Sequence, residues 1–398
     1  MKVLIASDCG VPTGYGRIAD EVGVRLKRRG YDIMAVSYYF DGLLPANLGG
    51  VALPYHVGVL NGKPSPQQAI GQVINVWQPD VVLSIQDMPY HTGLFYMPVT
   101  DWSRIARVII TPVDGVPIFP DWVKLAGEVD GMLTISQFGV EAYGAKGVRA
   151  RLCRPGVNTD AFYRKTPAER AELRAKLGLK PDDFLLGTMC QNQGRKAVSL
   201  MVQGFMEFAK DKPNAKYLLD MDEVSAAGWH LPYLIEQQGW DASKVIYRSD
   251  AARAGLVDLN DRYNALDAHV VLAHREGYGL PLAEAMACGV VSMALDYCSG
   301  TEIVGGGKGC LIKDIGYTVP GTWGGAEDRY PDMADFVAQL NFLHDNPAER
   351  EALALRGMAW ARAQTWDAAA DAVQAEIEAA AAKRALWLGA APVQAVAS

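Results

Sequence analysis

The sequence lacks the features that mark a membrane-embedded or secreted protein. No apolar run reaches the ~18 residues that a membrane-spanning helix needs. The first seven residues contain one lysine and a four-residue apolar run, which is too short for the apolar core of a secretion signal. We therefore expect a cytoplasmic protein, and peripheral contact with a membrane stays open.

Cysteine is scarce and never closely paired. The 398 residues include six cysteines and no C-x2-C pair, a spacing that fits neither a zinc ribbon nor a disulfide framework. We expect small buried thiols in a reducing compartment. These residues are Cys9, Cys153, Cys190, Cys288, Cys298 and Cys310.

An excess of basic charge is also missing. The formal net charge of −7 excludes the overall positive field that drives nonspecific binding to nucleic acid. One local basic cluster, Arg25 with Lys27, Arg28 and Arg29, keeps nucleic acid open as a partner, although a solvated helix face is the favoured interpretation. Half of the residues are hydrophobic, which excludes an intrinsically disordered chain.

Short apolar runs alternate with helical patterns, which predicts an α/β fold. Ile18, Val22 and Leu26 share one face of a helix expected over 17–29, after a loop rich in Gly and Pro over 9–16. The expected buried strands are 2–6, 33–36, 81–85, 108–111 and 131–135, and then 184–189, 217–219, 245–247, 269–272 and 290–293.

The strand–helix series breaks at a polar, proline-bounded segment near residue 160. We expect two doubly wound, Rossmann-like domains, residues 1–160 and 161–366, facing a central cleft. The carboxyl ends of both sheets should face that cleft, where open α/β sheets bind ligands. An alanine-rich helix over 367–388 should pack back on the first domain.

The segment 267–289 contains the pattern that predicts a binding site. A strand runs into a turn containing Gly277 and Gly279, and Pro281 is expected as the first residue of the next helix. Glycines before a helix N-terminus let a phosphate approach backbone N–H groups. Glu276 precedes this helix, and Glu284 is expected near its first turn. A carboxylate beside a phosphate needs hydroxyl groups to bind, and a ribose diol would supply them.

The run EGYGLPLAEAMACG, residues 276–289, resembles the E-x7-E signature of retaining GT-B glycosyltransferases of glycosyltransferase family 4. The resemblance extends over roughly residues 1–370. Its other landmarks are the glycine loop Gly14-Tyr15-Gly16, the turn Arg29-Gly30-Tyr31, the junction segment 154–162 ending in Phe162, the segment 301–304, and Trp366.

The resemblance implies roles for individual residues on the donor side. Glu284 would bind the ribose of a nucleotide sugar, and Glu276 would lie against the transferred sugar. The distal phosphate would be held by backbone groups around Gly277, Tyr278, Gly279 and Leu280. Lys196 would neutralise the diphosphate with Arg195, in altered spacing, because the usual arginine position holds Gln191. Gly14 and Gly16 would also contact the donor.

The family's catalytic histidine, commonly in a His-Asp pair, is missing at its expected place. Asp114 is present there without the histidine, and His91 is an alternative candidate that could line the acceptor side. His274, near Glu276, is a weaker candidate, and His269 is expected in the core.

Three other functions compete with this interpretation. Asp220-Met221-Asp222 resembles the metal-binding D-x-D of GT-A glycosyltransferases. Residues 14–19 match the G-x-G-x-x-A dinucleotide fingerprint, but Gly14 comes too late after the first strand. A non-catalytic sugar-nucleotide-binding protein on the same fold is the third alternative.

The sequence therefore predicts a retaining, metal-independent glycosyltransferase without a cofactor. It would move a hexose from a UDP- or GDP-linked sugar to a hydroxyl acceptor. That acceptor could be a glycan, a lipid, a metabolite or a modified DNA base.

Overall fold

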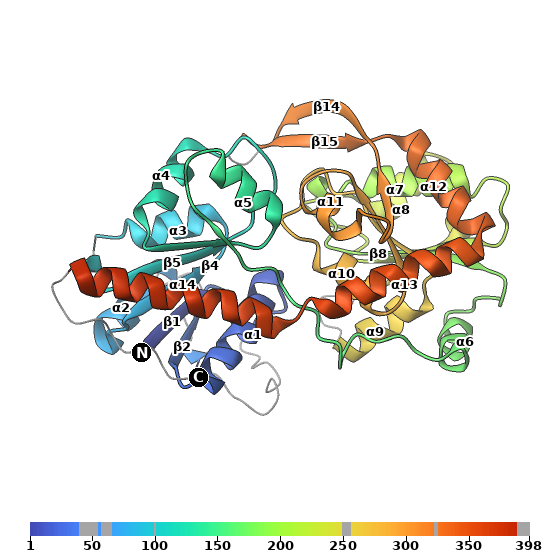
Figure 1. The fold of residues 1–398 in the computed structure, drawn as a ribbon. Coiled ribbons are helices and arrows are strands. Elements are labelled where there is room, and N and C mark those ends of the chain that lie inside the picture. Colours follow the sequence, from blue (N-terminus) through green and yellow to red (C-terminus); the bar gives the residue numbers. More distant parts are fainter. Residues whose placement is uncertain (40–54, 57–65, 99–100, 249–255, 322–324, 388–398) are drawn as a thin grey trace. The chain divides into compact units, whose positions relative to one another are not determined.

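The structure is a computed structural model that describes residues 1–39, 55–56, 66–98, 101–248, 256–321 and 325–387. The chain forms two units (Figure 1). The first comprises Met1–Gly156 together with the chain from Thr365 onward, and the second comprises Val157–Gln364. The second unit is thus inserted into the sequence of the first.

A parallel sheet forms the centre of the first unit, with strand order β3-β2-β1-β4-β5-β6-β7. The described strands are β1 (Lys2–Ser7), β2 (Asp32–Ser37), β3 (Tyr55–His56), β4 (Val81–Ile85), β5 (Ala106–Thr111), β6 (Gly131–Thr134) and β7 (Arg151–Leu152). Its described helices are α1 (Gly14–Arg28), α2 (Pro66–Trp77), α3 (Met88–Phe95), α4 (Pro120–Glu128), α5 (Gln137–Gly144) and α14 (Trp366–Trp387).

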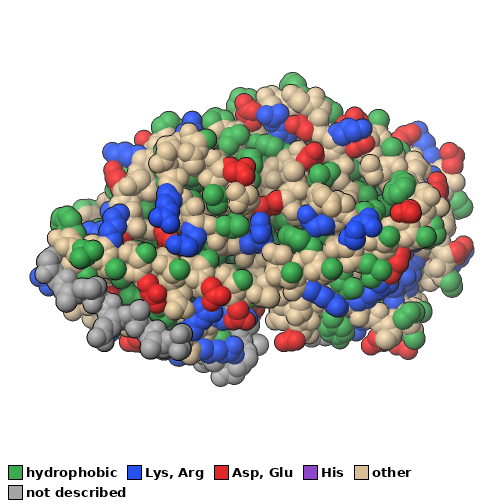
Figure 2. Space-filling model, in the orientation of Figure 1, with side chains coloured by type: hydrophobic (Ala, Val, Ile, Leu, Met, Phe, Trp, Pro, Cys, Tyr) green, Lys and Arg blue, Asp and Glu red, His purple; other side chains and the backbone are tan. Residues whose placement is uncertain are grey.

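Helix α14 belongs to the first unit although it ends the described chain. It packs against α1, β5 and β6 (Figure 1). Arg25 on α1 pairs with Asp367 at 3.0 Å, and Arg29 pairs with Asp371 at 2.7 Å. Two members of the basic cluster therefore meet acidic side chains of α14. Figure 2 shows basic and acidic side chains interspersed on the face in view.

The second unit has its own parallel sheet, with strand order β10-β9-β8-β11-β12-β13. These strands are β8 (Phe184–Met189), β9 (Ala215–Asp220), β10 (Val245–Arg248), β11 (Ala268–Val271), β12 (Val291–Leu295) and β13 (Cys310–Ile312), and β14 (Asp314–Pro320) pairs separately with β15 (Glu327–Pro331). Its described helices are α6 (Pro167–Lys176), α7 (Val198–Phe208), α8 (Leu231–Gln237), α9 (Leu256–Ala265), α10 (Leu280–Ala287), α11 (Ser299–Val304), α12 (Met333–Asp345) and α13 (Pro347–Ala363).

Both parallel sheets are doubly wound, so the predicted fold class of two Rossmann-like α/β domains is confirmed. In each sheet the chain builds outward on one side and then returns to the other side of its first strand. This reversal falls between β1 and β4 in the first unit, and between β8 and β11 in the second. Ligands of open α/β sheets bind at the carboxyl ends of the strands that flank such a switch point.

The expected start of the first helix is wrong by three residues. Helix α1 begins at Gly14, not at residue 17, because the Thr13 side chain accepts a hydrogen bond from the Gly16 N–H at 3.0 Å. Threonine is a good N-cap, since its hydroxyl satisfies an N–H that the first turn leaves unpaired. Gly14 and Gly16 therefore lie in the first helical turn and not in a loop.

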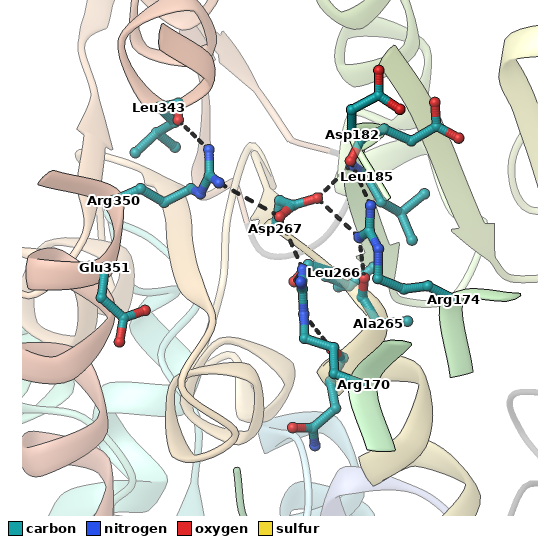
Figure 3. Close-up of polar contacts among 12 residues, drawn as sticks. Arg170, Arg174, Asp182, Leu185, Ala265, Leu266, Asp267, Leu343, Arg350 and Glu351 are labelled. Atoms are coloured by element: carbon teal, nitrogen blue, oxygen red, sulfur yellow. Dashed lines mark hydrogen bonds and ion pairs between the residues drawn. The ribbon is translucent and has the colours of Figure 1, made fainter. Parts of the chain in front are cut away.

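A largely buried carboxylate, Asp267, lies at the amino-terminal ends of the strands in the second sheet and joins the elements there. Asp267 pairs with Arg170 at 2.9 Å and with Arg174 at 3.0 Å, and Arg350 lies 3.6 Å away (Figure 3). The Leu185 N–H also donates to Asp267 at 2.8 Å. These contacts fasten α6 and α13 to the beginnings of β8 and β11, so the cluster supports the sheet.

All six cysteines are free thiols, as predicted, and all except the partly buried Cys190 are buried. In the described part of the chain, no helix is both long and apolar enough to span a membrane.

Candidate functional site

The candidate site lies in the second unit, at the carboxyl ends of β8 and β11. The loop after β8 carries Arg195 and Lys196, and the loop after β11 carries Glu276. The His274 N–H donates to the Arg195 carbonyl at 2.9 Å, which joins the two loops. The sheet topology thus brings together residues that are 80 positions apart in the sequence.

Lys196 and Glu276 form an ion pair across these two loops, and their side chains are 12% and 16% exposed. Burial raises the pKa of the Glu276 carboxyl, but the opposing effects outweigh it. These are the charges of Lys196 and Arg195, and hydrogen bonds from Lys196 and from the Tyr278 backbone N–H. The pKa of Glu276 therefore lies below its ordinary value, so the carboxylate is ionised at neutral pH.

Arg195 is fixed against the same loop. Its guanidinium donates to the Arg275 carbonyl at 3.2 Å. Asn192 holds the preceding residues in place, because its side chain accepts from the Trp229 N–H at 2.9 Å and donates to the Trp229 carbonyl at 2.8 Å. The two cations are thus presented by a loop that is tied down on both sides.

Helix α10 begins at this point of the site. Gly279 is its N-cap, with φ of +93°, a left-handed conformation that favours glycine. Leu280 is the first helical residue and Pro281 the second, so the expected position of Pro281 is wrong by one residue. The Ser299 hydroxyl donates to the Glu276 carbonyl at 2.9 Å and anchors the loop that enters the helix.

Glu284 is the fifth residue of α10, near the first turn as expected. Its residue exposure is only 4%, and one carboxylate oxygen accepts a hydrogen bond from the Tyr263 hydroxyl at 2.9 Å. The structure therefore places Glu276 before α10 and Glu284 inside it, with each carboxylate held by a different partner.

The β14–β15 pair fastens the loop that presents Glu276. The Arg329 N–H donates to the His274 carbonyl at 3.2 Å, and His274 Nδ1 lies 2.7 Å from the Arg329 carbonyl. Arg275 Nε donates to Asp328 at 2.5 Å. Sequence reasoning missed these positioning contacts, because no local motif connects residues 274–275 with residues 328–329.

The candidates in the first unit do not form a histidine–aspartate pair. His91 has no exposed surface, and its Nδ1 lies 2.8 Å from the Ser84 hydroxyl. Burial lowers the pKa of His91 to about 3, so the ring is neutral. Asp114 follows β5 and is partly exposed. The burial of His91 argues against direct contact with an acceptor, and its catalytic role stays a prediction.

Gly16 has a structural reason to be glycine. A Cβ atom there would lie 2.1 Å from the Val11 carbonyl oxygen and 2.7 Å from that of Asp8. Asp8 itself follows β1 at the switch point of the first sheet, and it accepts a hydrogen bond from the Thr13 hydroxyl at 3.0 Å. The predicted donor contacts of Gly14 and Gly16 stay predictions.

The D-x-D alternative does not fit the structure. Asp220 is fully buried, and both of its oxygens accept from Arg262 at 2.8 Å. Asp222 is exposed, so the two carboxylates do not converge. Among the described residues, no three His, Cys, Asp or Glu side chains are grouped so that they could hold a metal ion.

Comparison with known proteins gives matches to glycosyltransferases. Residues 254–319 match the model of the family "glycosyl transferases group 1". A D-inositol 3-phosphate glycosyltransferase of Geodermatophilus obscurus is 29% identical over 257 residues, 61% of this chain and 50% of that protein. One of Actinosynnema mirum is 30% identical, over 56% of this chain and 50% of that protein. The matched regions thus span about half the length of these relatives.

Solved structures match over nearly the whole chain. Sucrose-phosphate synthase from Thermosynechococcus elongatus has a TM-score of 0.71 at 17% identity, with 98% of this chain and 100% of that chain covered. An Anabaena protein crystallised with UDP-glucose has a TM-score of 0.68 at 16% identity, with 98% and 99% covered. The predicted resemblance is confirmed: this chain has the GT-B fold, and residues 254–319 of its second unit match the glycosyl transferases group 1 family.

Proposed function

We propose that this protein is a retaining glycosyltransferase that moves a hexose from a nucleotide diphosphate sugar to a hydroxyl acceptor without a metal ion. The observation that carries the proposal is the convergence of Arg195, Lys196 and Glu276 beside the start of α10, at the switch point of the second sheet. Two fixed cations and a helix N-terminus suit a diphosphate.

The proposed reaction uses each of these groups differently. Lys196, Arg195 and the start of α10 meet the charge that grows on the diphosphate as the glycosidic bond breaks. Glu276 accepts hydrogen bonds from the transferred sugar, and Glu284 from the ribose diol. We assign no nucleophile, and Glu276 acts by positioning the donor.

The donor can be identified before the acceptor is known. The Anabaena neighbour binds UDP-glucose, so UDP-glucose is the first donor to test, followed by GDP-linked hexoses. We expect one nucleotide sugar to raise the melting temperature, because a ligand that binds only the folded state stabilises it. If no nucleotide or nucleotide sugar has this effect at millimolar concentration, the proposal is wrong.

The relatives suggest a first acceptor. Because two of them are named D-inositol 3-phosphate glycosyltransferases, inositol phosphates should be assayed first, then glycans, lipids, metabolites and modified DNA bases. The anomeric configuration of the product, read by NMR, tests retention. An inverted product would contradict it.

A non-catalytic sugar-nucleotide-binding protein is the second candidate function. The burial of His91 and the absence of a histidine beside Asp114 in the sequence favour it. This candidate predicts that the bound nucleotide sugar is recovered intact after prolonged incubation with every acceptor class. Release of free nucleoside diphosphate in step with glycosylated product would exclude it.

A further inference from the structure

Tyr263 connects the junction segment of the second unit to Glu284. Its hydroxyl donates to Glu284 Oε2 at 2.9 Å, and the two residues are 1% and 4% exposed. Tyr263 lies on α9 and Glu284 on α10, so the hydrogen bond ties two neighbouring helices together.

The Tyr263 ring is itself held from two sides. The ring of Phe162 packs edge-on at 5.9 Å between centroids, and the ring of His269 packs edge-on at 5.6 Å. Burial lowers the pKa of His269 to about 3, so this ring is neutral and does not compete with Tyr263 as a cation for Glu284. The phenol therefore has little freedom to move, because aromatic contacts fix its ring in the core.

We propose that Tyr263 is a positioning residue that orients the Glu284 carboxylate toward the ribose hydroxyls of the nucleotide. The inference rests on the proposed function. The terminal torsion of a glutamate is broad, so a free carboxylate samples many orientations. A hydrogen bond to one oxygen from a fixed phenol selects one orientation, and a carboxylate can accept several hydrogen bonds at once.

In this arrangement the junction residue Phe162 contributes indirectly to ribose recognition. It supports the ring of Tyr263, which in turn orients the carboxylate that recognises ribose. The preference of the protein for ribose over 2′-deoxyribose should therefore depend on a hydroxyl that touches no part of the nucleotide.

The variant Tyr263→Phe removes this hydroxyl and keeps the ring that packs against Phe162 and His269. The matched control is Tyr217→Phe in the same unit. Tyr217 is also fully buried, and its hydroxyl lies 2.8 Å from the Thr188 hydroxyl, so this variant loses a similar hydrogen bond away from Glu284. Calorimetric titration with UDP and with 2′-deoxy-UDP gives the ratio of the two dissociation constants for each full-length variant.

We expect the wild type and Tyr217→Phe to prefer UDP, and Tyr263→Phe to lose roughly tenfold of that preference, as loss of a charge-assisted hydrogen bond would. The affinity for 2′-deoxy-UDP should change little. In Glu284→Gln, adding Tyr263→Phe should have almost no further effect, because the two residues act as one unit.

Three outcomes would overturn the inference. Tyr263→Phe could keep the full ribose preference, or it could weaken both nucleotides equally, as a purely structural loss would. The third outcome is a wild type that binds UDP and 2′-deoxy-UDP equally well. This result would contradict the ribose role of Glu284 but not the proposed nucleotide binding. A wild type that binds neither UDP nor GDP overturns the proposed function, and this inference with it.

Discussion

The ammonium group of Lys196 is bound to the carboxylate of Glu276, so each of these two groups is the partner of the other. A diphosphate and a sugar would need both groups. If the proposed function is right, donor binding replaces this ion pair by two new sets of contacts, and the energy of the pair is subtracted from the affinity for the donor.

Glu276→Gln should separate nucleotide binding from turnover. The substitution releases Lys196 from its counter-charge, so UDP should bind more tightly. Turnover with the matching UDP-sugar should fall at least roughly tenfold, because the sugar loses a charged hydrogen-bond acceptor. Calorimetry and steady-state kinetics measure the two effects.

Glu207→Gln is the matched control for this variant. Glu207 pairs with Lys210 at 2.7 Å on an exposed surface of the same unit. Its substitution should change neither UDP binding nor turnover. If Glu276→Gln weakens UDP and leaves turnover unchanged, the assigned roles are wrong.

Lys196→Ala should lower kcat/KM by roughly 10²–10³, the scale of losing one electrostatic stabiliser of the leaving group. Arg195→Lys should also be impaired, because a lysine cannot reproduce the guanidinium contact with the Arg275 carbonyl. The control is Lys210→Ala, which removes an exposed lysine. Full activity in both site variants, with melting temperatures unchanged, would place the diphosphate elsewhere.

Activity should survive an excess of EDTA. Asp220→Ala should instead lower the free energy of unfolding by about 3–5 kcal/mol, because it leaves the buried Arg262 without its counter-charge. Asp222→Ala, at an exposed position, should change stability little. Urea unfolding and an assay with EDTA test both statements. Loss of activity in EDTA with recovery in Mn²⁺ would contradict metal independence.

Stability should decrease as the pH falls below about 6.5. His91 and His269 have pKa values lowered from 6.5 to about 3 by burial, so they stay neutral in the folded chain and take up protons on unfolding. The unfolded state therefore binds more protons between these values, and each histidine contributes a slope of up to about 1.4 kcal/mol per pH unit.

The variant His91→Gln isolates this effect in the first unit, and His269→Gln does so in the second. The difference in unfolding free energy between the wild type and each variant should shrink from pH 7.5 to pH 5.5. The control is Tyr217→Phe, a buried substitution that removes no imidazole, for which this difference should not change. A parallel pH dependence in all four proteins would show that the buried rings are not responsible.

Most of the parallel strands could be predicted because a buried parallel strand is a nearly continuous apolar run. Residues 184–189 formed the expected strand without any shift. Glu276 could be predicted as a candidate because it follows such a strand within one loop, whereas Lys196 became a candidate through the family resemblance. The start of α1 could also have been predicted, since Thr13 is a recognisable N-cap.

Other parts of the site depend on contacts that leave no local pattern. Arg275 meets Asp328 across 53 residues, and Arg262 meets Asp220 across 42. A charged side chain is usually interpreted as solvated, so neither ion pair could be inferred from spacing. The β14–β15 pair was missed for a related reason, because its exposed Ile315 and Tyr317 give no buried face to detect.

Helix α14 returns to the first unit after the whole of the second has been made, and this order matters during synthesis. Until Trp366–Trp387 leaves the ribosome, β5 and β6 lack the cover that α14 provides, and the Val373 and Ile377 side chains of α14 are not yet buried. The nascent first unit therefore stays incomplete while the second unit, more than 200 residues long, is translated. A growing chain in that state offers chaperones an apolar sheet face, and the emergence of α14 allows the first unit to complete its packing.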